Sequence, residues 1–245
     1  MDEELEKMLR YLGLRGLLAN WDHYIGIAKK GSLSSVRLLK YVVEQEYKTK
    51  QENARKRRIS IAKIPEPFVI ETFPFDRQPK LNKKIILTFY DCFDYMSKQQ
   101  NIIWIGPTGT GKTGLATAFL TQAIDKGYRG KFILFPELVE ILYQSMADHS
   151  EKKVLKTFAA YDCLLIDEIG LVEIDSAQVG LFFSLMHERH KKKTTLITSN
   201  LGFDQWGSFL KNTQLTAALV DRLTENSHVI NMRNCKSLRT SLEQQ

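Results

Sequence analysis

The pattern of apolar and polar positions divides the chain into a helical first part and a remainder in which strands alternate with helices. Apolar residues recur at helical spacing over residues 5–31, and Gly13 and Gly16 interrupt them, so that two short helices fit as well as one. A second helix is expected over residues 34–47, which begin with two serines able to cap it, and beyond. We therefore expect a small helical domain in the first part of the chain.

Prolines and phenylalanines gather just after this helical part. The cluster consists of Pro65, Pro67, Pro74 and Pro79 with Phe68, Phe73 and Phe75. Proline stops helices, so this stretch predicts an extended, anchored linker. The boundaries expected from it are a helical domain over 1–64, a linker over 65–80 and a second domain over 81–245. Residues 81–98 resume a helical pattern, whose shared apolar side is formed by Ile85, Ile86, Phe89, Tyr90 and Phe93.

Beyond residue 100, short apolar runs alternate with helical segments. Strands are expected at residues 102–105, 131–135, 163–166, 194–198 and 228–232. Helices are expected from residue 112 to a C-terminal cap at Gly127, and over residues 137–147, 151–160 and 176–192. This alternation predicts an α/β domain with a parallel sheet flanked by helices.

The first of these strands leads into a phosphate-binding loop. Gly106, four intervening residues and Gly111-Lys112-Thr113 match the full G-x-x-x-x-G-K-[ST] motif, and a strand precedes it while a helix follows. Glycines let backbone N–H groups turn toward phosphate oxygens. Lys112 is expected to reach the β- and γ-phosphates, and the Thr113 hydroxyl to ligate Mg²⁺. The nucleotide-binding stretch as a whole is Gly106, Pro107, Thr108, Gly109, Thr110, Gly111, Lys112, Thr113 and Gly114.

Two acids follow the apolar strand at residues 163–166, about 55 residues after the phosphate loop. At the carboxyl end of a buried parallel strand, Asp167 is expected to hold the magnesium shell and Glu168 to polarise an attacking water. The strand candidate at residues 131–135 falls between the two motifs in the sequence, so we expect their strands not to be sheet neighbours. Asn200, after the strand at 194–198, is a candidate to orient the water or to touch the γ-phosphate.

Composition is that of a globular protein, and charge is distributed unevenly. Residues 1–100 carry 19 Lys and Arg against 13 Asp and Glu, whereas residues 101–245 carry 16 against 15. The basic excess in the first part suggests contact with a polyanion. No apolar run is long enough to span a membrane and the acidic start is unlike a signal peptide, so a cytoplasmic protein is expected. The three widely spaced cysteines predict neither a disulfide framework nor a metal site.

A basic run follows Tyr47 on the expected second helix. It contains Lys48, Lys50, Arg55, Lys56, Arg57, Arg58 and Lys63, with Glu52 as the single acid. Side chains on about four helical turns can contact one phosphate backbone, which predicts binding of double-stranded DNA. A basic face that is merely solvated is the alternative.

With these motifs in order, nearly the whole chain resembles the IstB family of AAA+ ATPases, the helper proteins of one class of bacterial insertion sequences, which are related to the helicase loader DnaC and the initiator DnaA. The segment ITSNLGFDQW resembles the family's first sensor, and AALVDRL resembles the segment with the arginine finger, which places that role on Arg222. LGLRGLL, the basic helix and FPFDRQP resemble the family's N-terminal DNA-binding domain. In the tail, the resemblance offers Arg239 as a second sensor, although the family's usual Gly-x-Ser-Tyr-Arg is replaced by other residues.

The resemblance also implies an activity. ATP and Mg²⁺ are expected to bind between subunits, with Glu168 and Asn200 of one subunit facing Arg222 of the next. A homo-oligomeric ring or spiral would form on duplex DNA, contact it through Lys152, Lys153 and Lys156, hydrolyse ATP, and recruit the cognate transposase to the target. Only 13 residues follow the last expected strand, which leaves room for a minimal C-terminal lid.

Two other functions stay open. The first is a helicase loader similar to DnaC, whose N-terminal domain grips a helicase; the basic run argues against it, because a protein-docking helix needs more exposed apolar surface. The second is a DNA-binding scaffold with a silent nucleotide site, against which the intact Lys112, Asp167 and Glu168 argue.

Overall fold

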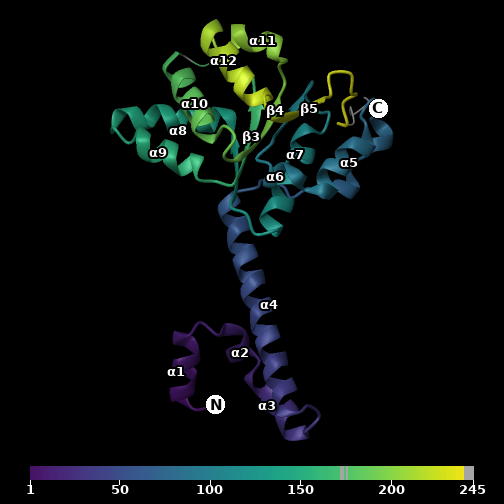
Figure 1. The fold of residues 1–245 in the computed structure, drawn as a ribbon, viewed down its shortest axis with the longest axis vertical. Helices are drawn as coiled ribbons and strands as arrows, with labels where there is room; N and C mark the ends of the chain where they lie inside the picture. The colour runs from purple at the N-terminus through teal and green to yellow at the C-terminus, as the bar shows by residue number, and fades with distance from the viewer. Residues whose placement is uncertain (172–173, 175, 240–245) are drawn as a thin grey trace, which may run out of the picture. The chain divides into compact units, whose positions relative to one another are not determined.

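The computed structural model describes residues 1–171, 174 and 176–239 of the chain. It divides the chain into two compact units, Met1–Arg58 and Ile59–Gln245. The long helix α4, Ser35–Ala62, begins in the first unit and ends in the second (Figure 1). No helix among the described residues is long and apolar enough to cross a bilayer.

The first unit begins with three short helices, α1 (Glu3–Tyr11), α2 (Arg15–Ala19) and α3 (Trp21–Lys30), where the sequence predicted one or two. Gly13, at a φ of 67°, separates α1 from α2. The carboxylate of Glu46 on α4 accepts the Leu17 N–H at 2.7 Å. The two helices approach closely here, as shown by a β-carbon placed at Gly16, which would stand only 2.7 Å from Glu46 Oε2. Glycine at position 16 therefore lets α2 approach α4.

Few apolar side chains of the first unit are buried. Its buried apolar residues are Leu9 and Tyr24. One stripe on the N-terminal half of α4 is open to solvent, and its exposed fractions are 78% for Val36, 66% for Leu39, 59% for Val43 and 62% for Tyr47. These positions recur at helical spacing, so they form a continuous apolar stripe on one side of α4.

The second unit is built on a parallel five-stranded sheet of order β2-β3-β4-β1-β5. The strands are β1 (Asn101–Ile105), β2 (Gly130–Leu134), β3 (Cys163–Ile169), β4 (Thr194–Ser199) and β5 (Ser227–Asn231). As predicted, β1 and β3 are not neighbours in the sheet, although the strand between them is not the one that intervenes in the sequence. The strand that separates them is β4, which comes later in the sequence, and β2 lies at the sheet edge beyond β3.

Helices cover both faces of this sheet (Figure 1). Side chains alternate between faces along a strand, so Ile102 and Trp104 of β1 join one apolar cluster, whereas Ile103 and Ile105 join the other. The first cluster includes residues of α5 (Lys83–Cys92), α6 (Asp94–Ser97) and α7 (Lys112–Asp125). The second includes residues of α8 (Phe135–Ala147), α9 (Glu151–Ala159), α10 (Ser176–Arg189), α11 (Phe203–Phe209) and α12 (Thr213–Thr224).

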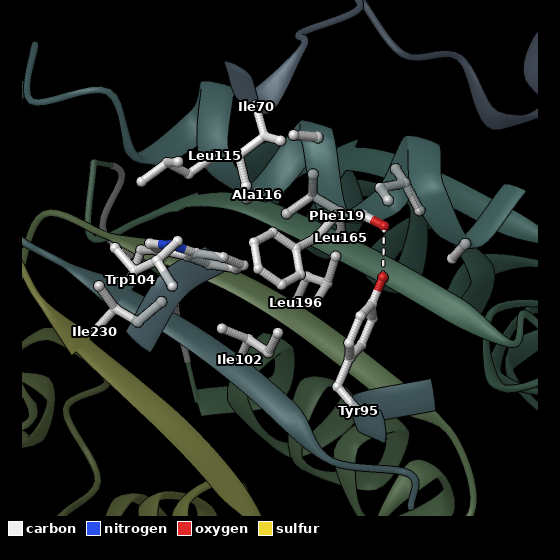
Figure 2. Close-up of a cluster of buried hydrophobic side chains, with 14 of the residues drawn as sticks. Ile70, Tyr95, Ile102, Trp104, Leu115, Ala116, Phe119, Leu165, Leu196 and Ile230 are labelled. Carbon is white, nitrogen blue, oxygen red and sulfur yellow. Dashed lines mark hydrogen bonds between the residues drawn. The ribbon is translucent and has the colours of Figure 1, made fainter. Parts of the chain in front are cut away.

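Aromatic side chains pack among aliphatic ones in the first cluster (Figure 2). Trp104 and Phe119 are fully buried, and their ring centroids lie 5.5 Å apart in an edge-to-face arrangement. The Tyr95 hydroxyl donates to the Phe119 carbonyl oxygen at 2.8 Å, so α6 is hydrogen-bonded to α7. These contacts fix α7, and with it the phosphate loop that precedes it, against the sheet.

Residues 65–80 pack as part of the second unit, although the sequence suggested a linker here. The segment contains two short 3-10 helices, η1 (Ile70–Thr72) and η2 (Phe75–Arg77), and its Ile70 and Phe73 are buried in the first apolar cluster. Apolar side chains without a helical period occur in buried irregular segments as well as in linkers. The pattern of prolines therefore does not distinguish a buried irregular segment from a linker.

The helical pattern over residues 81–98 forms two helices, because Phe93, at a φ of 57°, interrupts it. Ile85 differs from the expected apolar side. It is 47% exposed, whereas Ile86 is buried.

Candidate nucleotide-binding site

The phosphate loop connects the carboxyl end of β1 to the first residue of α7, Lys112. Gly111, at a φ of 95°, caps the helix. A β-carbon at this position would stand 2.6 Å from the ring of Phe73, so both backbone conformation and packing require glycine. The loop N–H groups at this helix end lie where the helix dipole favours anions.

Lys112 lies inside the loop and is 6% exposed. Its ammonium donates to the Pro107 carbonyl oxygen at 2.8 Å. Burial lowers the pKa of Lys112 to about 8, although Asp167 and Glu168 oppose this change. Among the described residues, a carbonyl is the one acceptor of this buried ammonium, which is therefore well suited to bind an anion that enters the loop.

Asp167 is buried beneath the loop at 2% exposure. The Thr113 hydroxyl donates toward both of its carboxylate oxygens, at 3.0 and 3.1 Å. The Thr198 hydroxyl donates to Oδ1 at 2.5 Å. Burial raises the pKa of Asp167, and the hydrogen bonds from Thr198 and Thr113 offset part of that rise. Thr113 and Asp167, which the sequence assigned to one metal site, thus lie in contact.

Glu168 follows in β3 with a backbone φ of 66°. Its N–H donates to Thr198 Oγ1 at 2.9 Å, so the hydroxyl of Thr198 contacts both acids. Positive φ in a residue other than glycine occurs often at functional sites, where the surrounding contacts maintain it. The N–H of Asn200, one residue past β4, donates to the Ile169 carbonyl oxygen at 3.2 Å.

These residues surround one pocket of about 290 Å³. Its lining consists of Thr108, Gly109, Gly111, Lys112, Thr113, Glu168, Thr198, Asn200, Leu238 and Arg239. The loop, the second acid of β3 and the amide after β4 therefore converge, as the sequence predicted. Arg239 also lies at this pocket, where its guanidinium is close enough to contribute to the lowered pKa of Lys112.

The remaining predicted loop residues have structural contacts. The Thr110 hydroxyl donates to the Pro107 carbonyl oxygen at 2.9 Å, which closes the loop. Gly106 passes the backbone of Met232, to which a β-carbon would stand 2.6 Å away. At Gly114 a β-carbon would stand 3.1 Å from the ring of Phe68, which occupies the space that a bulkier residue would need.

Arg222 is held by contacts with residues of α10 and α12. It lies in the last turn of α12, where Nη1 donates to the Ala218 carbonyl oxygen at 2.9 Å and the guanidinium lies 4.9 Å from the ring centroid of Phe183. Among the described residues that line the nucleotide pocket, Arg222 does not occur.

The predicted DNA-binding residues fall into two groups. Six belong to α4 in the first unit, namely Lys48, Lys50, Arg55, Lys56, Arg57 and Arg58, while Lys63 follows the end of the helix in the second unit. Glu52 lies 3.6 Å from Arg55 and 4.0 Å from Lys56. Lys152, Lys153 and Lys156 are all exposed on α9.

Three residues of this region, Thr198, Leu238 and Gln78, have no role predicted from the sequence. Thr198 lies within the segment ITSNLGFDQW, in which only Asn200 has a role predicted from the sequence. Leu238 lines the pocket from an irregular segment without any periodic signal. Gln78 is buried at 2% exposure and contacts the loop from the segment taken as a linker.

Fold and site together define a nucleotide-binding domain with a phosphate loop and a parallel sheet. In shape the chain is similar to the solved structure of the DnaC helicase loader, with a TM-score of 0.51 and 24% identity, over 60% of this chain and 85% of that one. This likeness concerns the fold.

The chain belongs to the family of IstB-like ATP binding proteins, whose model matches residues 7–245. Among relatives, it is 29% identical to a protein of insertion sequence IS232 from Bacillus thuringiensis subsp. berliner that is named for ATP binding, over 94% of this chain and 92% of that protein. It is 28% identical to the corresponding protein of IS21 from Pseudomonas aeruginosa, over 94% and 86%.

Proposed function

We propose that this protein is an ATP-dependent DNA-binding helper of transposition, which assembles on duplex DNA, hydrolyses ATP and recruits a transposase. One observation carries the nucleotide part of this proposal. The Thr113 hydroxyl, the Asp167 carboxylate and the buried ammonium of Lys112 converge at one end of the sheet, beside a pocket that Glu168 and Asn200 also line. Membership in a family from insertion sequences carries the biological part.

Each side chain has a defined task in this proposal. Lys112 binds the β- and γ-phosphates, Glu168 accepts a proton from the attacking water, and Asn200 orients that water. Hydroxyl and carboxylate oxygens are the ligands that magnesium prefers, and Thr113 and Asp167 supply both types in contact. These two residues would hold Mg²⁺, whose charge balances that of the phosphates.

The transition state for phosphoryl transfer gains from a further positive charge, and Arg222 is the proposed source of it in a neighbouring subunit. The stacking of Arg222 on Phe183 and its bond to the Ala218 carbonyl oxygen keep its guanidinium on the surface of α10 and α12. A homo-oligomer that brings this surface against the pocket of the next copy would complete the site.

Double-stranded DNA is the proposed polyanion. The basic residues of α4 and the three exposed lysines of α9 would contact phosphates, and the shape and backbone of the duplex, rather than its base sequence, would be recognised. Because each subunit contributes a few contacts, affinity depends on assembly and falls steeply with salt.

A helicase loader is the second candidate, and one observation favours it. Its N-terminal domain would need an apolar docking surface, and the stripe formed by Val36, Leu39, Val43 and Tyr47 on α4 is such a surface. The sequence suggested that this helix has too little exposed apolar surface to dock a protein. The stripe supplies such a surface, so that argument does not count against the helicase loader.

DNA binding measured by fluorescence anisotropy distinguishes the transposition helper from the helicase loader. The full-length protein is titrated into duplex and single-stranded DNA of equal length, with ATP, ADP or no nucleotide, over a salt series. The transposition helper is expected to bind duplex cooperatively, only with ATP, and with a steep salt dependence. A preference for single strands, or weak binding whatever the nucleotide, would favour the loader.

Matched variants identify the source of each effect. Lys112→Ala is expected to abolish the ATP dependence, since the loop then lacks its phosphate-binding ammonium. Lys48→Ala with Lys50→Ala is expected to lower the salt slope by about two, because each lost phosphate contact removes about one unit. The control is Lys29→Ala with Lys30→Ala on α3, which changes the net charge equally.

A further inference from the structure

The segment after β5 returns to the phosphate loop. The Met232 N–H donates to the Ile105 carbonyl oxygen at 2.6 Å, and the Leu238 N–H donates to the Gly109 carbonyl oxygen at 2.7 Å. Residues 232–239 have no helix or strand of their own. Two of them, Leu238 and Arg239, nevertheless form one wall of the nucleotide pocket. Something other than regular backbone pairing must therefore hold this wall in place.

Gln78 supplies that support. Its Nε2 donates to the Lys236 carbonyl oxygen at 2.6 Å, and its Oε1 accepts the Lys236 N–H at 3.1 Å. The same Nε2 donates to the carbonyl oxygen of Thr110, in the phosphate loop, at 3.4 Å. One side-chain amide thus satisfies the backbone of the C-terminal segment in both directions and also contacts the loop.

Gln78 is itself firmly held. Its N–H donates to the Phe75 carbonyl oxygen at 2.8 Å, and its carbonyl oxygen accepts the Leu81 N–H at 2.9 Å. The preceding Phe73 packs against Gly111 of the loop. Because the backbone on either side of Gln78 is fixed, its amide can act as a rigid anchor.

The chemistry of the position favours a specific role over simple filling of space. Burying an amide costs free energy unless its hydrogen bonds are satisfied, and an apolar side chain would fill the same volume without this requirement. Gln78 is 2% exposed and directs both amide atoms at the two segments that form the pocket. Its contacts to Lys236 lie two residues before Leu238 and three before Arg239.

We propose that Gln78 is a positioning residue of the nucleotide site: by binding the backbone of Lys236, it holds Leu238 and Arg239 against the phosphate loop so that they close over a bound nucleotide. This inference rests on the proposed binding of ATP. Gln78 does not touch the nucleotide, and its effect passes through the segment 236–239. Loss of the clamp is expected to weaken nucleotide binding and to loosen that segment, while the sheet and loop stay folded.

The test compares Gln78→Met, which has a similar volume and no amide, with the wild type in the full chain. Dissociation constants for ATP and ADP are measured by titration with fluorescent analogues. Loss of about two hydrogen bonds predicts affinity about tenfold weaker. In the same samples without nucleotide, hydrogen exchange read by mass spectrometry is expected to speed up in a peptide covering residues 236–239, but not in peptides of β1 and β3.

Two further variants make the result decisive. Gln78→Glu retains an acceptor for the Lys236 N–H but places a carboxylate against two carbonyl oxygens, so it is expected to weaken binding at least as much. Gln144→Met removes an exposed amide that donates to Glu140 on its own helix, and it is expected to bind as the wild type does.

The two readouts must change together. Three results would overturn the positioning role. They are weaker nucleotide binding without faster exchange at 236–239, faster exchange without weaker binding, and no change in either. If the wild type itself binds neither ATP nor ADP, the proposed function fails instead, whatever Gln78 does.

Discussion

The hydroxyl of Thr198 donates a hydrogen bond to Asp167 Oδ1 at 2.5 Å, and Thr198 Oγ1 itself accepts the N–H of Glu168 at 2.9 Å. One side chain on β4 therefore orients both adjacent acids of β3. Because Thr198 is fully buried and also lines the pocket, its hydroxyl has a fixed environment. The bond to Asp167 favours the ionised carboxylate, against the burial that raises its pKa.

Thr198→Val tests this arrangement, because it keeps the shape and removes the hydroxyl. We expect ATP turnover to fall by roughly 10- to 100-fold, as is typical when a residue that orients a metal ligand is lost. The magnesium concentration needed for half-maximal turnover should rise as well, since the pKa of Asp167 then increases. Steady-state ATPase assays over a magnesium series measure both effects.

Thr121→Val is the matched control for that variant. The Thr121 hydroxyl lies on α7 and is buried without a hydrogen-bond partner among the described residues. Its removal should leave turnover and the magnesium requirement unchanged. Equal losses in both variants would mean that the Thr198 hydroxyl has no specific role.

The parts of the fold that follow from periodicity could be predicted from the sequence. Strand positions, the phosphate loop and the acids of β3 are local patterns, and their convergence follows from parallel strands that end at the same sheet edge. The sheet order could be predicted only in part. The sequence predicted that β1 and β3 are not neighbours, but not that β4 lies between them, because sequence order does not determine which strand inserts in a sheet.

Contacts between irregular segments could not be predicted. The bonds from Gln78 to Lys236 join residues separated by 158 positions, and neither residue lies in a helix or strand. Leu238 likewise reaches the pocket through a backbone bond to Gly109. Such contacts depend on how three separate segments pack, and no pattern within any one of them encodes the partner.

Arg189 provides a prediction about stability. It is 1% exposed at the end of α10, and its guanidinium donates to the carbonyl oxygens of Phe158, Ala159 and Tyr161 at the end of α9, at 3.0, 3.3 and 2.8 Å. It also bonds to Thr194 and Thr195 at the start of β4. Burial lowers its pKa to about 10, so the guanidinium remains charged at neutral pH and satisfies carbonyl groups that α9 leaves without partners.

Arg189→Met is therefore expected to lower the free energy of unfolding by about 3 to 5 kcal/mol, because several buried carbonyl groups lose their donor. Arg189→Lys should recover little of this, since one ammonium cannot reach acceptors spread over two segments. Urea unfolding followed by circular dichroism gives the values. Arg233→Met, which breaks an exposed pair with Asp204, is the comparison and should change stability by less than about 1 kcal/mol.

The hydrogen bonds of Asp162 lead to a prediction of how the free energy of unfolding depends on pH. Burial raises its pKa, but hydrogen bonds from Lys193 at 2.5 Å and from the Arg129 N–H at 3.0 Å outweigh burial, and the pKa is lowered overall. A carboxyl group with a lowered pKa stabilises the fold above its unfolded pKa of about 4, and this contribution is lost as pH falls through the lower folded value. Asp162→Asn should cost about 1 to 2 kcal/mol at pH 7.

As the pH falls through the lowered folded pKa of Asp162 and the carboxyl group becomes protonated in both states, the difference between this variant and the wild type should shrink. Urea midpoints measured from pH 7 down to pH 3 give this comparison. A difference that stays constant over that range would show that the charge of Asp162 makes no contribution.

Arg222 leads to a prediction about assembly. Its guanidinium lies on Phe183 and bonds to the Ala218 carbonyl oxygen, while the pocket of its own chain is lined by other residues. If it completes the site of a neighbour, Arg222→Ala should reduce ATP turnover by about a thousandfold and leave nucleotide affinity nearly unchanged, because the finger acts on the transition state.

Mixing two inactive variants separates action in a neighbour from action in the same chain. Arg222→Ala retains an intact pocket, and Lys112→Ala retains the arginine, so mixed oligomers contain some sites with both groups. We expect the mixture to regain turnover that neither variant shows alone, as measured by phosphate release at fixed total protein. If Arg222→Ala forms normal oligomers and hydrolyses ATP at the unchanged rate, Arg222 is not an arginine finger. If the mixture is as inactive as its components, Arg222 acts in the site of its own chain.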